Sequence, residues 1–283
     1  MNKWRNIRAV CAETWTEGLA KPQFFAALLF VFVFTAMRSF RFIPLLAQDA
    51  GRLIVPEVVV LSLNDSLTYF FVMGGFFIFL MRAPFLARTD TVFLPRVQRD
   101  PWIWGKILFL GEYLLMATLA NDLFMLFICA PFVDFQRWNT WTPFLVEQYY
   151  LGAEIGAVSP LYCLVCTYFL NFCLLFFLAL LTLFLNLYYQ RTASLLLVGG
   201  LCALTMLLND LGPLYTRLSL ISHAQFLSHQ FQGLDNILGG PARFTPAIWE
   251  SFVVFLTLTA LLLLLILRRV RRCDFQMNGK GMN

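Results

Sequence analysis

Charged residues are scarce in this chain of 283 residues. Only 13% of the residues are charged, whereas 60% are hydrophobic, a balance outside the usual range of soluble globular domains. The stretches between the apolar runs are too short to form a globular domain, and the longest lie near 133–159 and 212–246. We therefore expect one membrane domain over residues 1–283 and no soluble domain.

Several chemical motifs are also missing from the sequence. It contains no G-x-x-x-x-G-K-[ST] segment to hold nucleotide phosphates and no H-E-x-x-H segment to hold a catalytic metal ion. The only two histidines, His223 and His229, lack converging carboxylates, so we expect no metal site there. The net charge of +5 has no basic soluble domain to carry it, so we expect no nucleic-acid partner. We likewise expect no catalytic residues and no cofactor bound by this chain.

The seven cysteines are an odd number, and nearly all lie within or beside apolar runs. Cys163 and Cys166 have the C-x-x-C spacing of a metal or redox site, but a metal would require more soft or imidazole ligands nearby. Because free cysteine packs as a small hydrophobic residue, we interpret this pair as packing residues.

Long apolar runs dominate the chain. A helix needs about 20 apolar residues to cross a bilayer core, and its backbone must be hydrogen-bonded within the segment. The alternation of apolar and polar residues that is typical of barrel strands is absent from these runs. We predict an all-α polytopic membrane protein with six transmembrane helices, near residues 23–43, 62–81, 103–132, 160–189, 193–211 and 247–267.

Basic residues fall mostly in alternate gaps between the predicted spans. Most of the 21 Lys and Arg residues lie in the segments 3–21, 82–106, 191 and 268–280. Basic residues favour the cytoplasmic face of a membrane. We therefore predict a multi-pass protein of the cell (plasma) membrane with both termini and the loop 83–105 in the cytoplasm.

Two further segments are partly apolar but are not predicted to cross the membrane. In residues 1–22, charged residues alternate with apolar ones at helical spacing, which indicates an amphipathic interfacial helix; a disordered basic tail is the alternative. The apolar positions of that helix are Trp4, Ile7, Cys11, Trp15 and Leu19. In residues 212–246, Gly and Pro interrupt an apolar sequence, which favours a re-entrant outer hairpin between the fifth and sixth helices.

The inner loop 83–105 is longer than a turn requires. Asp90 and Thr91 are suited to cap a short apolar helix, and arginines follow it. This pattern indicates a docking element for a cytoplasmic partner, and an ordinary basic loop with interfacial tryptophans is an equally good interpretation. The candidate contact residues are Val92, Phe93, Leu94, Arg96, Arg99 and Trp102.

Three polar residues within the predicted spans are candidates for a transport pathway. They are Glu112, Asp122 and Asn171. An ionisable group inside a membrane is costly unless it faces a polar interior, so it is a functional candidate. The alternatives are that Glu112 pairs with an inner arginine and that Asp122 lies near the outer interface. Asn171 is also suited to hydrogen-bond between helices.

This arrangement resembles the membrane-spanning permease subunit of a type 2 ABC exporter. That class has an amphipathic N-terminal helix, six spans, a cytoplasmic coupling element and an outer re-entrant hairpin, which match residues 3–20, 83–105 and 212–246 here. The residues Arg96, Arg99, Trp102 and Lys106 are similar to its R-x-x-R-x-x-W-x-x-x-K entry to the third span. The tail Arg268-Arg-Val-Arg-Arg-Cys-Asp-Phe275 looks like its basic ending. The proline-rich approach to the coupling element and the aromatic loop 133–150 depart from the pattern.

The resemblance implies a translocation pathway for an amphipathic substrate, such as a peptide, a lipid-linked molecule or a drug. It implies that ATP and Mg are bound by a separate cytoplasmic ABC ATPase subunit, and that a second copy or a related permease completes a dimeric membrane domain. The alternatives are a proton-coupled secondary transporter that uses Glu112 or Asp122, and a non-transporting scaffold subunit. The absence of a clear repeat between the two halves counts against the secondary transporter.

Overall fold

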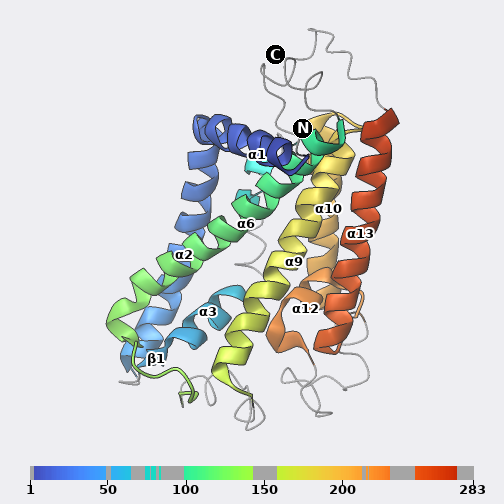
Figure 1. The fold of residues 1–283 in the computed structure, drawn as a ribbon. Coiled ribbons are helices and arrows are strands. Elements are labelled where there is room, and N and C mark those ends of the chain that lie inside the picture. Colours follow the sequence, from blue (N-terminus) through green and yellow to red (C-terminus); the bar gives the residue numbers. More distant parts are fainter. Residues whose placement is uncertain are drawn as a thin grey trace.

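The computed structural model describes residues 3–48, 52–64, 74–76, 78–80, 83, 99–142, 158–211, 215, 217–229 and 246–272. These residues form a helical bundle with one short pair of strands (Figure 1). The elements are α1 (Lys3–Leu19), α2 (Pro22–Gln48), β1 (Leu53–Ile54), α3 (Val55–Leu63), α6 (Arg99–Cys129), η1 (Ala130–Phe132), β2 (Val133–Asp134), α9 (Pro160–Asn186), α10 (Arg191–Asp210), α12 (Leu220–Ala224), η2 (Phe226–Ser228) and α13 (Ile248–Arg272). Strands β1 and β2 pair in parallel, with Leu53 opposite Val133.

Four helical stretches in the described part of the chain are long and apolar enough to cross a membrane. They are Arg99–Phe132, Pro160–Asn186, Arg191–Leu208 and Ile248–Arg272. A fifth is obtained if the bent pair Lys3–Leu19 and Pro22–Met37 is counted as one span. The prediction of an all-α protein with several membrane-length helices is confirmed. The number of six spans stays a prediction, because the predicted span 62–81 lies largely outside the described residues.

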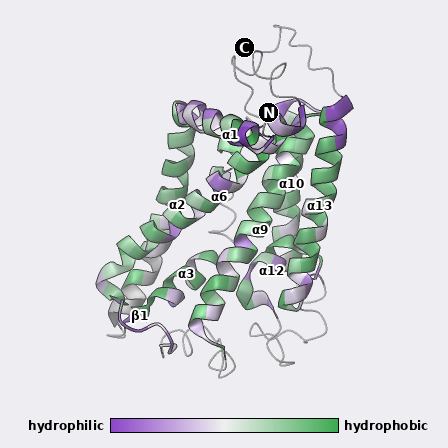
Figure 2. Ribbon diagram, viewed as in Figure 1, coloured by the Kyte–Doolittle hydropathy of each residue, from purple (hydrophilic) through white to green (hydrophobic). Residues whose placement is uncertain are grey.

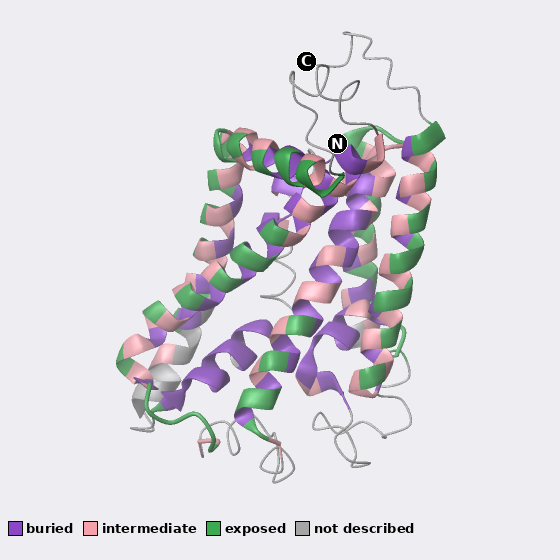
Figure 3. Ribbon diagram, in the orientation of Figure 1, coloured by how far each residue is buried: buried purple, intermediate pink, exposed green. Residues whose placement is uncertain are grey.

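The outward faces of the long helices are apolar (Figures 2 and 3). Phe127 on α6 is 77% exposed, Leu196 on α10 is 70% exposed and Leu256 on α13 is 72% exposed. Soluble monomers rarely expose apolar surface on this scale, whereas lipid chains are as apolar as leucine and cover it readily. The outward surface of these helices is therefore suited to contact with the lipid chains of a bilayer.

Helix α1 runs across one end of the bundle and is bent by 74° from the start of α2 (Figure 1). We call this end, which also holds the start of α6 and the last turn of α13, the termini end. The opposite end, which holds α3, α12 and η2, is called the far end. Most of the helical core lies between them, where α6 and α9 run antiparallel and α13 packs on both (Figure 1).

The predicted N-terminal helix is present, but its inward face differs from the predicted stripe. Val10, Cys11, Thr14 and Gly18 are its buried residues, whereas Trp4 and Leu19, two members of the predicted stripe, are exposed. The reason is that α1 packs against α6, so its buried face is set by a protein neighbour.

The predicted re-entrant segment 212–246 is described only in part. Residues 217–229 contain the short helices α12 and η2, and Ile221, Ala224 and Phe226 are fully buried there. Helix α12 packs against α9, α10 and α13. The remainder of the segment lies outside the described residues, so the hairpin stays a prediction.

Candidate functional site

A groove with a volume of about 570 Å³ opens between α1, α6 and α9 at the termini end. Its walls are mainly apolar, and aromatic side chains contribute to all three sides. The aromatic residues are Trp4, Trp104, Phe172 and Phe176. Lys3 on α1 and Glu112 on α6 are the charged residues that border it. The groove, which we call the α1 groove, therefore offers an apolar surface with one basic and one acidic group.

A glycine on α6 allows α1 to form one wall of this groove. A Cβ atom at Gly105 would lie 2.6 Å from Cβ of Val10 and 2.8 Å from the carbonyl oxygen of Ile7. Any larger residue at this position would push the two helices apart. The absence of a side chain at Gly105 therefore permits the close approach of α1 to α6.

Glu112 fastens α1 to α6 beside the groove. Its Oε2 atom accepts a hydrogen bond from Nε1 of Trp15 at 2.8 Å and one from the Cys11 thiol at 3.3 Å. The Trp15 ring also packs edge-on against Phe109, with ring centroids 5.0 Å apart. The structure thus places this pathway candidate at the edge of the groove, where its hydrogen-bond partners are α1 residues and not the arginine of the alternative interpretation.

Asp122, the second pathway candidate, lies on the buried side of α6 and is only 5% exposed. Its Oδ1 atom has no hydrogen-bond partner in the structure. The neighbouring Asn121 accepts a hydrogen bond from the Thr35 hydroxyl of α2. Asp122 therefore lies in a polar layer between helices, and one of its oxygens is unsatisfied.

Asn171, the third pathway candidate, is fully buried on α9. Its Nδ2 atom donates to the Thr167 carbonyl oxygen at 2.8 Å, and its Oδ1 atom has no partner in the structure. The Tyr168 hydroxyl donates to the Leu115 carbonyl oxygen at 2.9 Å, which aligns the two antiparallel helices. By this alignment Asn171 and Asp122 lie about 15 Å apart along the helix axes, so they belong to different levels of the bundle.

Four of the six predicted coupling residues, Val92, Phe93, Leu94 and Arg96, lie outside the described residues. Of the other two, Arg99 donates from Nη1 to the Arg271 carbonyl oxygen at 3.0 Å. Trp102 is fully buried, so its indole supports the start of α6 and is not placed to contact a partner directly.

The start of α6 is fastened to the end of α13. The Arg271 guanidinium donates to both carboxylate oxygens of Asp100, at 3.0 Å and 2.7 Å. Near it, the Arg269 guanidinium lies 4.3 Å from the centre of the Tyr188 ring, which follows α9. A forked pair of this kind fixes orientation as well as distance. Helices α6, α9 and α13 are therefore tied together at the termini end.

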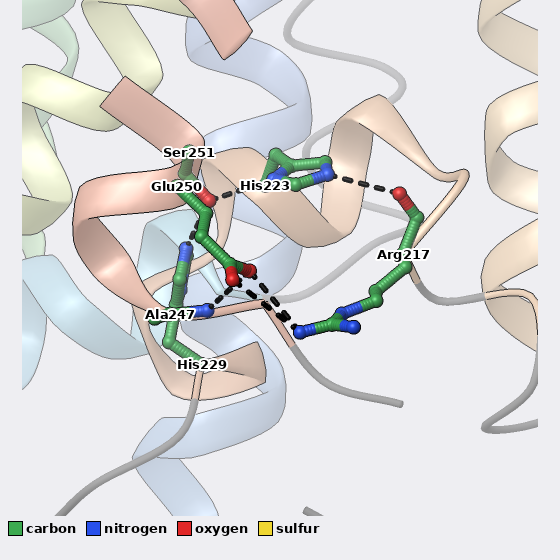
Figure 4. Close-up of polar contacts among 6 residues, drawn as sticks. All are labelled: Arg217, His223, His229, Ala247, Glu250 and Ser251. Carbon is green, nitrogen blue, oxygen red and sulfur yellow. Dashed lines mark hydrogen bonds and ion pairs between the residues drawn. The ribbon is translucent and has the colours of Figure 1, made fainter. Parts of the chain in front are cut away.

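A polar cluster at the far end was not predicted from the sequence (Figure 4). His223 and His229 each approach the Ser251 hydroxyl oxygen at 2.7 Å, through Nδ1 and Nε2 respectively. Beside them, Glu250 pairs with Arg217 at 3.3 Å. The only signal in the sequence is that both histidines fall in one loop. Ser251 lies 22 and 28 residues further along, so spacing gives no indication of the contact.

Glu57 is a second polar residue that the sequence analysis missed. It is fully buried on α3, and its carboxylate accepts hydrogen bonds from the backbone N–H groups of Ile54, at 2.8 Å, and Thr142. Burial raises the pKa of the Glu57 carboxyl, and these hydrogen bonds act in the opposite direction. Glu57 therefore joins α3 to the loop that follows β2.

Cys163 and Cys166 are buried free thiols that pack with Leu170 and Phe226. In the described part of the chain, no group of three or more His, Cys, Asp or Glu side chains is placed to hold a metal ion. Comparisons of the chain with protein families, curated proteins and solved structures gave no match. Its function must therefore be argued from the geometry of the chain itself.

Proposed function

We propose that the chain is the permease subunit of an ATP-driven ABC exporter of the type 2 class, and that the α1 groove receives its amphipathic substrate. On this proposal the termini end faces the cytoplasm. Basic residues of α1, of the first turns of α6 and of the last turns of α13 gather at that end, and basic residues favour the cytoplasmic face.

The observation that carries the proposal is the set of contacts made by α6, the helix that follows residues 83–98 in the sequence. Arg271 of α13 holds Asp100 at the first turn of α6, and Glu112 of α6 holds Trp15 of α1. A displacement of that loop by a partner would reach α6 first and would carry α1 and α13 with it. Packed elements move in this way as rigid bodies.

The α1 groove lies where such a movement would change its shape, because α1 and α6 form two of its walls. The apolar part of an amphipathic molecule fits the aromatic walls, and its polar part would meet Lys3 or Glu112. The substrate classes suited to this surface are a peptide, a lipid-linked molecule or a hydrophobic drug. Substrate would enter from the cytoplasmic leaflet.

Energy for transport has to come from another subunit on this proposal. The sequence contains no phosphate-binding loop, so ATP and Mg would be bound by a cytoplasmic ABC ATPase subunit. A second copy of this chain, or a related permease, would complete the membrane domain. The contact with the ATPase would use Val92, Phe93, Leu94 and Arg96, together with Arg99 at the start of α6.

The test is vanadate-sensitive ATP hydrolysis in nanodiscs. We expect none from the purified chain alone and restoration by an ATPase subunit that co-purifies from native membranes and carries a phosphate-binding loop. The Phe93→Ala and Arg96→Ala variants should each weaken partner binding by tenfold or more, since truncation of an anchor residue in an interface costs about 2 kcal/mol or more. The matched control is Arg137→Ala at the far end, whose side chain is 74% exposed.

A further variant separates partner binding from coupling. Asp100→Asn removes the charge that Arg271 grips, while leaving the proposed contact surface unchanged. We expect partner binding to persist and ATPase turnover to fall. Robust hydrolysis by the lone chain, or full partner binding by Phe93→Ala, would refute the proposal.

A proton-coupled secondary transporter is the second candidate, and the unpartnered Oδ1 atom of buried Asp122 favours it. In proteoliposomes that lack any ATPase, this candidate predicts substrate movement driven by a pH gradient and abolished by Asp122→Asn. Transport that requires ATP and survives Asp122→Asn would exclude it.

A further inference from the structure

Two buried histidines at the far end compete for the hydroxyl proton of one serine. Ser251 Oγ lies 2.7 Å from Nδ1 of His223 and 2.7 Å from Nε2 of His229. Ser251 and His229 are fully buried, and His223 is 6% exposed. Both distances are those of strong hydrogen bonds, so each requires a proton between its two atoms.

The backbone decides which ring nitrogens carry hydrogen. His229 Nδ1 lies 2.9 Å and 3.1 Å from the carbonyl oxygens of Gln225 and Phe226. His223 Nε2 lies 3.0 Å from the carbonyl oxygen of Arg217. Carbonyl oxygens only accept, so each of these nitrogens is the donor. If both rings are neutral, the nitrogens that face Ser251 carry lone pairs.

A neutral cluster is therefore one proton short. The Ser251 hydroxyl has one hydrogen and can satisfy His223 or His229, which leaves a lone pair against an oxygen across the other contact. One added proton completes both contacts, because His223 Nδ1 then donates to Ser251 and Ser251 donates to His229 Nε2.

We propose that His223, Ser251 and His229 bind one proton in common and that this proton fastens residues 217–229 to α13. This inference is independent of the proposed transport function. It assigns the cluster a structural proton and no catalysis, since no substrate reaches the buried Ser251 oxygen.

The surroundings of the cluster both lower and raise the pKa of the two imidazoles. Burial, the largest effect, lowers the pKa of both imidazoles, that of His229 to about 4. The hydrogen bonds to backbone carbonyl oxygens and the Glu250 carboxylate on α13 raise the pKa of both rings, whereas the Arg217 charge lowers the pKa of His223 and a charge on His223 lowers the pKa of His229. On this proposal the two contacts to Ser251 outweigh the effect of burial, because the neutral cluster leaves one ring lone pair facing the Ser251 oxygen at 2.7 Å with no hydrogen between them, and a buried polar atom without its hydrogen bond is costly.

The direction of the pH effect follows from this balance. An exposed histidine has a pKa of about 6.5. If the folded cluster holds its proton more tightly than an exposed histidine does, its pKa lies above about 6.5. The contact between residues 217–229 and α13 is then complete below that pH and is lost as pH rises towards the raised pKa. If desolvation prevailed, closure would instead be lost in acid.

Opening would have a defined structural consequence. Phe226 and Leu227 pack against the buried thiols of Cys163 and Cys166 on α9. The Leu227 amide donates to Asn64 Oδ1 at 3.0 Å, and the His223 and Gln225 amides donate to Ser219 and Ile221 carbonyls. Release of the segment would expose these amides to solvent exchange.

The experiment is amide hydrogen exchange of the full chain in nanodiscs between pH 6 and pH 9, with each rate corrected for its intrinsic pH dependence. We expect protection of residues 220–229 to fall with rising pH, by up to about tenfold per pH unit for one proton. Protection in the middle of α9 serves as the internal control and should stay constant.

Two variants test the proton count. Asn at position 223 places an amide donor where the protonated ring nitrogen stood, so His223→Asn should keep the segment protected and abolish the pH dependence. Ser251→Ala removes the bridging oxygen and should reduce protection at every pH, with α9 unchanged. Constant wild-type protection, protection that falls in acid, or an unchanged pH dependence in His223→Asn would overturn the proposal.

Discussion

At the termini end, the charged residues Lys3 and Glu112 border an open groove, whereas at the far end Glu57, His229 and Ser251 are fully buried. Both ends use side chains to hold segments distant in sequence. Glu112 holds α1 on α6, with its carboxylate at a partly open surface. Glu57, whose side chain is fully buried, joins α3 to Thr142.

The difference teaches where the molecule can change shape. A hydrogen bond at an exposed site can be exchanged for one to water or to a ligand, so its loss costs little. A buried polar group has no such substitute, and its loss leaves partners unsatisfied. The termini end is therefore suited to movement, and the far end to fixing the bundle. The predictions below test this contrast, beginning with the largest effect.

The far end should depend most strongly on Glu57. Glu57→Ala leaves the buried backbone N–H group of Ile54 and the part-buried N–H group of Thr142 without an acceptor. We expect a loss of about 2–5 kcal/mol in the free energy of unfolding, since each unsatisfied buried donor costs roughly 1–3 kcal/mol. Denaturant unfolding in detergent measures it, and exposed Arg137→Ala, the control, should change stability by less than about 0.5 kcal/mol. Equal effects of the two variants would remove the contrast between buried and exposed groups.

The contact between α1 and α6 should be sensitive to any side chain at Gly105. Gly105→Ala places a methyl group against Val10 and the Ile7 backbone, and overpacking of this kind costs about 1–3 kcal/mol. Gly199→Ala on α10 is the matched control, because nothing lies within 4 Å of the added atom, and it should be neutral or stabilising by up to about 1 kcal/mol. Thermal unfolding compares them. A Gly105→Ala protein as stable as Gly199→Ala would show that α1 is not held closely.

The smallest effect should come from the Trp15 hydrogen bond to Glu112. Trp15→Phe keeps an aromatic ring against Phe109 and removes the N–H group, and we expect a loss of about 1 kcal/mol. Trp249→Phe, a change at a 66% exposed residue of α13, serves as the control. Increased proteolysis of α1 in Trp15→Phe, with unfolding of the bundle nearly unchanged, would sharpen the assignment. A loss as large as that of Glu57→Ala would contradict it.

Parts of the fold and the site could be predicted from residues along the chain. The apolar runs predict α6, α9, α10 and α13 because the length of a membrane helix is set by local composition. The same reasoning finds α1 but misplaces its inward face: Val10 and Gly18 are buried because α6 lies against them. The pathway candidates Asp122 and Asn171 are buried as expected for polar groups in spans, but their different levels depend on how α6 and α9 align.

The sequence by itself determined that this protein is helical with several apolar segments of membrane length, because hydrophobic length acts through each segment alone. Tertiary structure decided which polar groups meet. Ser251 reaches His223 and His229, and Glu112 reaches Trp15, only because folding brings together residues 22 to 97 positions apart. No periodicity encodes such contacts, since they depend on the helix packing that settles which donor finds which acceptor.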